Sequence, residues 1–148
     1  MKNIAPESTR TRLAPRWLAV AALLHPAILL KNPRRRARLS VLLATAFVVG
    51  TAALGAFIYP DYRARLKQHI FLEAPRIGWM FERKEHLAVG VLAFALVGCV
   101  AHLGAGLVVD EGARLTVARL SHRAFVASFV MALIVASLGV AVASFKSF

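Results

Sequence analysis

Histidines are the residues of this sequence with the most chemistry open to them. His25 and His102 lie inside apolar stretches of the kind that crosses a bilayer, and His86 stands at the start of one. His69 and His122 lie in the connections between such stretches. An ionisable side chain inside a membrane span is energetically expensive, so the first three histidines are candidates for function.

His25 and His102 lie at similar depths from one side of the membrane. His25 is six residues before Lys31, and His102 is eight residues before Asp110. With a helical rise of 1.5 Å per residue, these separations correspond to depths of ~9 and ~12 Å. Two imidazoles facing each other from different helices can hold the iron of a b-type haem. The spacing therefore predicts His25 and His102 as haem iron ligands.

Small residues surround His102, and they allow two interpretations. Gly98 and Gly106 stand four residues before and after it, on nearly the same helical face. Such glycines leave room for a flat macrocycle. They equally allow a neighbouring helix to pack closely in lipid, and a membrane histidine can simply bond across helices.

His86 cannot share a small cofactor with His102, because about 24 Å of helix separates them. It could ligate a second haem with another subunit, border a quinone site or relay protons. With His69, Glu73 and Glu82 it could form a metal site, although this spacing is not specific. The remaining alternative is a boundary histidine within a headgroup charge cluster.

Signatures of stand-alone enzymes are missing from the sequence. It contains no glycine-rich phosphate loop, no HExxH and no Gly-x-Ser-x-Gly. Cys99 is the only cysteine, which excludes an internal disulfide and a cysteine-based metal or iron–sulfur site. These absences favour an electron-transfer or non-catalytic subunit over an enzyme acting alone.

The elements that carry these histidines are membrane-spanning helices. The chain is 59% hydrophobic and 18% charged, against about 45–50% and 25% in soluble domains. Three stretches, 39–60, 86–109 and 124–145, contain no Asp, Glu, Lys or Arg. Each exceeds the ~20 residues that a helix needs to cross the hydrocarbon core. Their residues do not alternate as barrel strands must, so helices are expected.

A shorter apolar stretch carries His25. It runs from Trp17 to Leu30, and we expect a short span over 14–30 that is bent at Pro26. It could instead lie flat in the interface. Residues 61–73 predict an amphipathic interfacial helix between the second and third spans. The predicted fold is one all-α membrane domain over 1–148, a bundle of four transmembrane helices.

The net charge is +12, and the basic residues gather at the ends of the apolar stretches. That placement indicates contact with lipid headgroups rather than nucleic acid. Arg34, Arg35 and Arg36 are candidates for binding anionic headgroups. Lys and Arg occur in comparable numbers on both sides, so they do not fix the orientation. We expect a multi-pass protein of a bacterial inner (cytoplasmic) membrane.

Together these features predict a small membrane subunit of a respiratory or other electron-transfer complex, with haem b and quinone as candidate ligands. The layout is similar to that of the small haem-bearing membrane anchors of respiratory enzymes, although no motif carries the likeness. The main alternative is a cofactor-free accessory subunit that packs against partner helices and stabilises them. A small oligomeric channel or transporter is a third interpretation.

Overall fold

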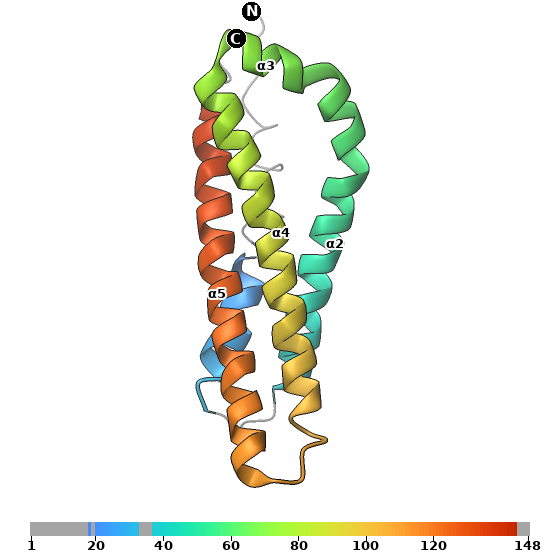
Figure 1. Cartoon of the computed structure of the whole chain (residues 1–148), viewed down its shortest axis with the longest axis vertical. Coiled ribbons are helices and arrows are strands. Elements are labelled where there is room, and N and C mark those ends of the chain that lie inside the picture. Colours follow the sequence, from blue (N-terminus) through green and yellow to red (C-terminus); the bar gives the residue numbers. More distant parts are fainter. Residues whose placement is uncertain (1–17, 19, 33–36, 145–148) are drawn as a thin grey trace, which may run out of the picture.

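The computed structural model describes residues 18, 20–32 and 37–144, and every element in that part of the chain is helical (Figure 1). A short helix, Val20–Leu29, comes first. The elements after it are α2 (Arg38–Tyr62), the π-helical turn η1 (Arg63–Lys67), α3 (Gln68–Glu73), α4 (Pro75–Gly104) and α5 (Glu111–Ser144).

Three helices are long and apolar enough to cross a membrane. The qualifying segments are Arg38–Asp61, Pro75–Gly104 and Glu111–Val142, with 24, 30 and 32 residues. At 1.5 Å per residue, even the first reaches about 36 Å, more than the ~30 Å of a hydrocarbon core. The all-helical fold and three helices of spanning length are therefore confirmed.

Two of these helices begin earlier than the apolar stretches predicted. α4 starts at Pro75, where the missing N–H of proline is tolerated in the first turn. α5 starts at Glu111, and the backbone N–H of Ala113 donates to Asp110 Oδ2 at 2.6 Å. Both helices therefore include charged residues. Their backbone hydrogen bonding extends beyond the uncharged stretches of the sequence.

The predicted interfacial helix over 61–73 is helical but not one element. α2 continues through Pro60 to Tyr62, and the turn η1 separates it from α3. Proline inside a helix removes one backbone donor and disturbs the preceding turn. The turn before Pro60 nevertheless stays α-helical, and the π-helical turn begins three residues after it. The location of this segment at the membrane surface stays a prediction.

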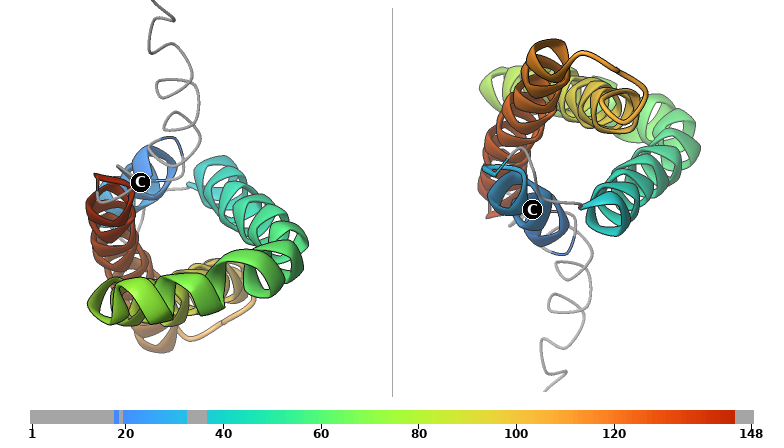
Figure 2. Two further views of the ribbon diagram at one scale, coloured as in Figure 1. Left: turned by 90° about the horizontal axis from the view of Figure 1, so that it is seen from above. Right: turned by 90° about the horizontal axis from the view of Figure 1, so that it is seen from below.

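α4 and α5 form an antiparallel hairpin and lie side by side along their length (Figures 1 and 2). α2 packs against α4 near its own N-terminal end and then diverges from the pair. The burial pattern agrees with this divergence, since Val41, Ala44 and Val48 are buried and no residue from Val49 to Pro60 is.

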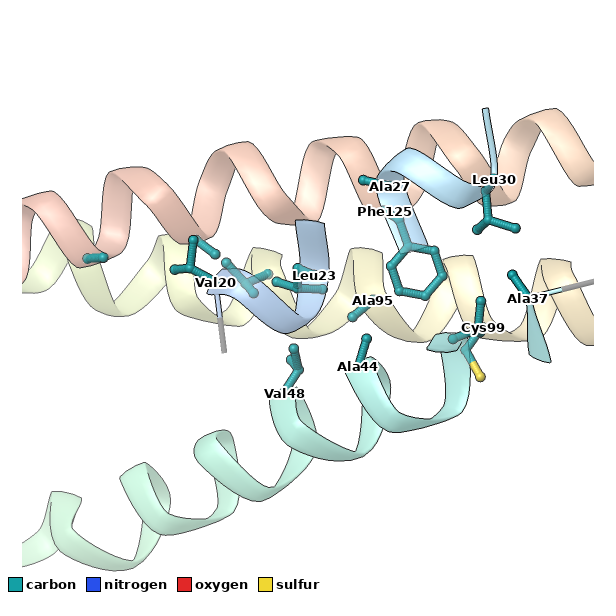
Figure 3. Close-up of a cluster of buried hydrophobic side chains, with 14 residues drawn as sticks. Val20, Leu23, Ala27, Leu30, Ala37, Ala44, Val48, Ala95, Cys99 and Phe125 are labelled. Carbon is teal, nitrogen blue, oxygen red and sulfur yellow. The ribbon is translucent and has the colours of Figure 1, made fainter. Parts of the chain in front are cut away.

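The short helix Val20–Leu29 fills the space between α2 and α5, across from α4 (Figure 2). Its buried residues join a core cluster to which all the long helices contribute (Figure 3). Ten helical residues reach only ~15 Å. A full fourth crossing, and with it the four-span bundle, stays a prediction. The cluster contains Val20, Leu23, Ala27, Leu30, Ala37, Val41, Ala44, Val48, Val91, Ala95, Cys99, Phe125, Ala132 and Ala136.

Candidate functional site

His25 is held by a serine from the next helix. The distance between His25 Nδ1 and Ser40 Oγ is 2.7 Å, and the tautomer of the ring decides which group donates. Ser40 lies in the first turn of α2, and the connection between the two helices is short. The bond therefore joins the two helices near this connection and fixes the orientation of the imidazole. The other ring nitrogen, Nε2, takes no part in this bond.

Beside this pair lies an open groove of about 440 Å³. Its volume falls within the ~300–1,000 Å³ typical of small-molecule sites. Its walls are apolar apart from His25 and Ser40, so a ligand would meet its polar partners at one place only. The lining residues are Ala22, His25 and Leu29 from one side, and Ala37, Leu39, Ser40, Leu43, Ala44 and Phe47 from the other.

The structure does not bring His102 to this groove. All lining residues come from the range 22–47, whereas His102 lies near the C-terminal end of α4. The positive charge of Arg38 acts on the His102 imidazole, and Arg38 Nη2 lies 3.2 Å from the place that a Cβ on Gly106 would take. His25 and His102 thus have different neighbours.

The interior of the bundle in this region is occupied by side chains. Leu23 and Val41 are fully buried, and Ala95 and Phe125 meet them in the core cluster (Figure 3). Protein interiors of this kind pack with few voids. A haem bridging His25 and His102 would require this packing to open, and their joint ligation of iron stays a prediction.

Gly98 makes room for a helix. A Cβ atom at this position would lie 2.8 Å from Cδ2 of Phe125, which is fully buried. Ser121 Oγ also donates to the Gly98 carbonyl oxygen at 2.7 Å. Of the two interpretations of the glycines around His102, close packing between helices is the one seen at Gly98.

A second serine repeats this contact along the hairpin. Ser128 Oγ donates to the Val91 carbonyl oxygen at 2.8 Å, and both serines are fully buried. The donors are seven residues apart, and so are the acceptors at Val91 and Gly98. This regular spacing fixes the register of α4 against α5. The serine spacing was visible in the sequence, but the carbonyl partners were not.

His86 bonds within its own helix. Its Nδ1 atom lies 2.8 Å from the Glu82 carbonyl oxygen, and the side chain is exposed. The Glu82 carboxylate pairs with Lys67 Nζ at 2.8 Å. That hydrogen bond, followed by the charge of Glu82, raises the pKa of Lys67 above its usual 10.5. His86 therefore lies beside a charged pair, and its role at a membrane boundary stays a prediction.

The metal site that the sequence offers at His86, His69, Glu73 and Glu82 stays a prediction. No three His, Cys, Asp or Glu side chains come close enough to hold an ion in the part of the chain that is described. The His69 side chain lies outside the described residues. The quinone and proton-relay roles of His86 stay predictions.

His122 is a half-buried residue that sequence reasoning passed over. Its Nδ1 atom is enclosed and has no hydrogen-bond partner among the residues described.

No protein-family model, curated protein or solved structure matches the chain.

Proposed function

We propose that this chain is a small multi-pass membrane subunit that packs against partner transmembrane helices in a larger complex. The observation that carries the proposal is the second half of α2. From Val49 to Pro60 no residue is buried, and Phe57 is 84% exposed. α4 and α5 each have one packed face and one outer face, whereas this half of α2 has no packed face.

The composition of this half-helix suits a helical partner. Nothing lies within 4 Å of a Cβ placed at Gly50 or Gly55. Small residues let the backbones of two helices approach closely in lipid, where van der Waals packing is a main source of association. The proposed site of assembly is therefore the surface of residues 49–60.

Membrane insertion and location belong to the same proposal. Helix Val20–Leu29 forms the core of the short fourth span over 14–30, with flanking basic side chains reaching the interfaces. Arg34, Arg35 and Arg36 lie outside the described residues, and the proposal that anionic headgroups meet this basic connection rests on the sequence. The proposed location is a bacterial inner membrane.

Purification of the tagged full-length chain from its native membrane tests the assembly. We expect other membrane proteins to copurify at fixed stoichiometry. The Gly50→Leu/Gly55→Leu variant should lose them, because the added side chains prevent close approach. Ala93→Leu is the matched control, since Ala93 is an exposed residue of α4 and should retain them. A chain that is always purified alone, or a double variant that keeps its partners, would contradict the proposal.

The electron-transfer form of this proposal is a second candidate, which one observation favours. Ser40 fixes the His25 ring by its Nδ1 atom, and such outer partners commonly orient histidine ligands of metals. The second axial nitrogen would come from His102 or from a partner. A haem bound in this way would give the subunit its redox chemistry.

An absorption spectrum of the purified complex distinguishes the two candidates. A Soret band that His25→Ala abolishes, and that His86→Ala leaves unchanged, would support haem ligation by His25. A complex that copurifies without a Soret band would contradict the electron-transfer role and leave the accessory role as the remaining candidate. Sensitivity to His102→Ala tests the predicted second ligand in the same preparation.

A further inference from the structure

We propose that the outer face of α5 binds a transmembrane helix of a partner subunit through a carboxylate that pairs with Arg123. The inference rests on the membrane assembly proposed above and deepens it. It adds a second contact surface to residues 49–60 of α2, and it names the chemistry of the residue that the partner brings there.

The uncharged stretches of α2 and α4 lie over the same part of the bundle. At one end, Arg38 in the first turn of α2 places Nη2 3.2 Å from the position that a Cβ on Gly106 would take. At the other end, Lys67 of η1, just after α2, pairs with Glu82 of α4 at 2.8 Å. The two helices therefore define one apolar layer, between the levels of Gly106 and Glu82.

α5 carries charge further into this layer than α2 or α4 does. Its first turns begin beyond the start of α2 (Figure 1). Ser121 Oγ donates to the Gly98 carbonyl oxygen, and the ring of Phe125 lies against position 98. Arg123 stands midway between these two residues of α5. It therefore lies at about the level of Gly98.

That level is deep within the apolar layer. Gly98 is eight residues from Gly106 and sixteen from Glu82, which correspond to ~12 and ~24 Å of helix. Long basic side chains extend to the headgroups from positions near helix ends, but Arg123 lies more than two turns from either end. An arginine at such a depth is energetically costly unless another group compensates its charge.

Arg123 has no compensating group in the part of the chain that is described. Its side chain is exposed, and no ion pair or hydrogen bond joins it to another described residue. Arg119, one turn earlier on the same face, is exposed and unpaired in the same way. Arg114, nearer the start of α5, pairs with Glu111 instead. The charge of Arg123 therefore calls for an anion from elsewhere.

A carboxylate on a neighbouring helix provides such an anion. Lipid phosphates lie outside the hydrocarbon core, whereas a helix can carry an acidic residue at any depth. A second copy of this chain in the same orientation does not suffice, because its described carboxylates lie near or beyond the ends of the layer. They are Asp61, Glu73, Glu82, Glu85, Asp110 and Glu111. The partner helix therefore belongs to a different chain.

Apolar residues continue the face of α5 on which Arg123 lies. Val126 is 37% exposed and Val130 is 47% exposed, three and seven residues after Arg123, which is the spacing of one helical face. Ser121 and Ser128, which bond to α4, are fully buried on the opposite side. A partner helix can pack along the valines, and a bidentate pair between its carboxylate and the guanidinium fixes its rotation.

Quantitative copurification of the tagged full-length chain tests this pairing. Arg123→Gln should lower the amount of partner recovered about tenfold or more, because truncating one member of a buried ion pair weakens binding strongly. Arg123→Lys keeps the charge and should retain more partner than Arg123→Gln. Arg114→Gln is the matched control on the same helix and should retain the partner, because Arg114 is already paired.

Thermal unfolding in detergent shows whether the chain itself is affected. Arg123→Gln should unfold with the parent, because Arg123 has no ion pair or hydrogen bond within the described residues. A less stable variant would give Arg123 a role inside the chain and would overturn the proposal.

A photo-crosslinking amino acid at position 126 identifies the partner helix. We expect it to join a transmembrane segment of another chain that carries Asp or Glu within about one turn of the joined residue. Exchanging that acid for Lys should reduce recovery, and so should Arg123→Glu. The two changes together should restore it, because they reverse the pair.

Several further results would overturn the pairing. Undiminished recovery in Arg123→Gln would refute it while leaving the proposed membrane subunit in place. Crosslinks from position 126 to lipid or to a second copy alone would show that no other chain covers this face. An equal loss in Glu7→Gln, a residue outside those described, would assign the anion to this chain. A parent chain that always purifies alone would contradict the proposed function, and the pairing with it.

Discussion

The ring of Phe125 occupies the space that a side chain at position 98 would need, with Cδ2 only 2.8 Å from an ideal Cβ on Gly98. The contact brings α5 against the backbone of α4 in the half of the hairpin nearer the connection between the two helices. It lies beside the bond from Ser121 to the Gly98 carbonyl, so packing and hydrogen bonding act at the same place.

Gly98→Ala should therefore destabilise the hairpin by roughly 1–3 kcal/mol, the usual range for overpacking a core. Gly90→Ala should have a smaller effect, because its nearest neighbour is the flexible end of Met131. Thermal unfolding in detergent measures both variants. Gly50→Ala is the control, since open space surrounds Gly50. Equal losses of stability in Gly98→Ala and Gly50→Ala would contradict this packing of Phe125 against Gly98.

Gly98→Leu is consequently a test of folding and not of assembly. The reason is that position 98 faces α5 of the same chain, so a large side chain there would meet Phe125 before it met any partner helix. Phe125→Leu, introduced together with Gly98→Ala, should recover part of the lost stability because the smaller residue yields space. A double variant no more stable than additivity predicts would show that the two residues are not coupled.

Ser121→Ala and Ser128→Ala should each reduce the stability of the α4–α5 hairpin by about 0.6–1.7 kcal/mol, the range for hydrogen bonds between helices in lipid. Each substitution removes a buried donor to a carbonyl of the other helix. Ser137→Ala is the matched control, because Ser137 is exposed and bonds to Leu133 within its own helix. A loss in the control as large as in the buried serines would refute an interhelical role.

His25→Ala and Ser40→Ala should each loosen the contact between the short helix and α2. Because the two side chains share one hydrogen bond, the double variant should lose less than the sum of the single variants. The expected coupling is about 0.5–1.5 kcal/mol. A double-mutant cycle by thermal unfolding measures it, and strictly additive losses would show that the bond has no energetic effect.

The Lys67–Glu82 pair should respond to alkaline pH. The pKa of Lys67 is raised above 10.5 in the folded chain, first by its hydrogen bond to Glu82. The stabilisation is therefore fully present below the pKa of the unfolded lysine and is lost as pH rises through the higher folded value. Trp79 fluorescence can follow the release of η1 and α3 from α4, because Trp79 of α4 packs against Phe71 of α3 with their ring centroids 6.0 Å apart.

Lys67→Met provides the comparison for this titration. The variant keeps the length of the side chain but cannot carry the charge, so its fluorescence should lack the alkaline transition. If the variant and the parent show the same transition, another group is responsible and the ion pair does not hold η1 and α3 against α4.

The sequence alone determined the number of long apolar helices. The length of an uncharged stretch decides whether it can cross a bilayer, whatever it packs against. The stretches 39–60 and 86–109 correspond to α2 and α4, although α4 ends at Gly104, five residues before the second stretch does. The third stretch lies within α5 up to Ser144, the last residue described. The ends of the helices were predicted less accurately. The start of α4 at Pro75, for example, depends on local backbone hydrogen bonding, which hydropathy does not report.

Only the tertiary structure decided which faces meet. In a soluble helix the polar face marks the surface, but in lipid both the packed and the outer faces are apolar, so the pattern does not reveal the rotation of a helix. Gly98 could have faced a haem, a partner or α5, and the packing of all helices together placed it against Phe125. The same packing joined His25 to Ser40 rather than bringing it to His102.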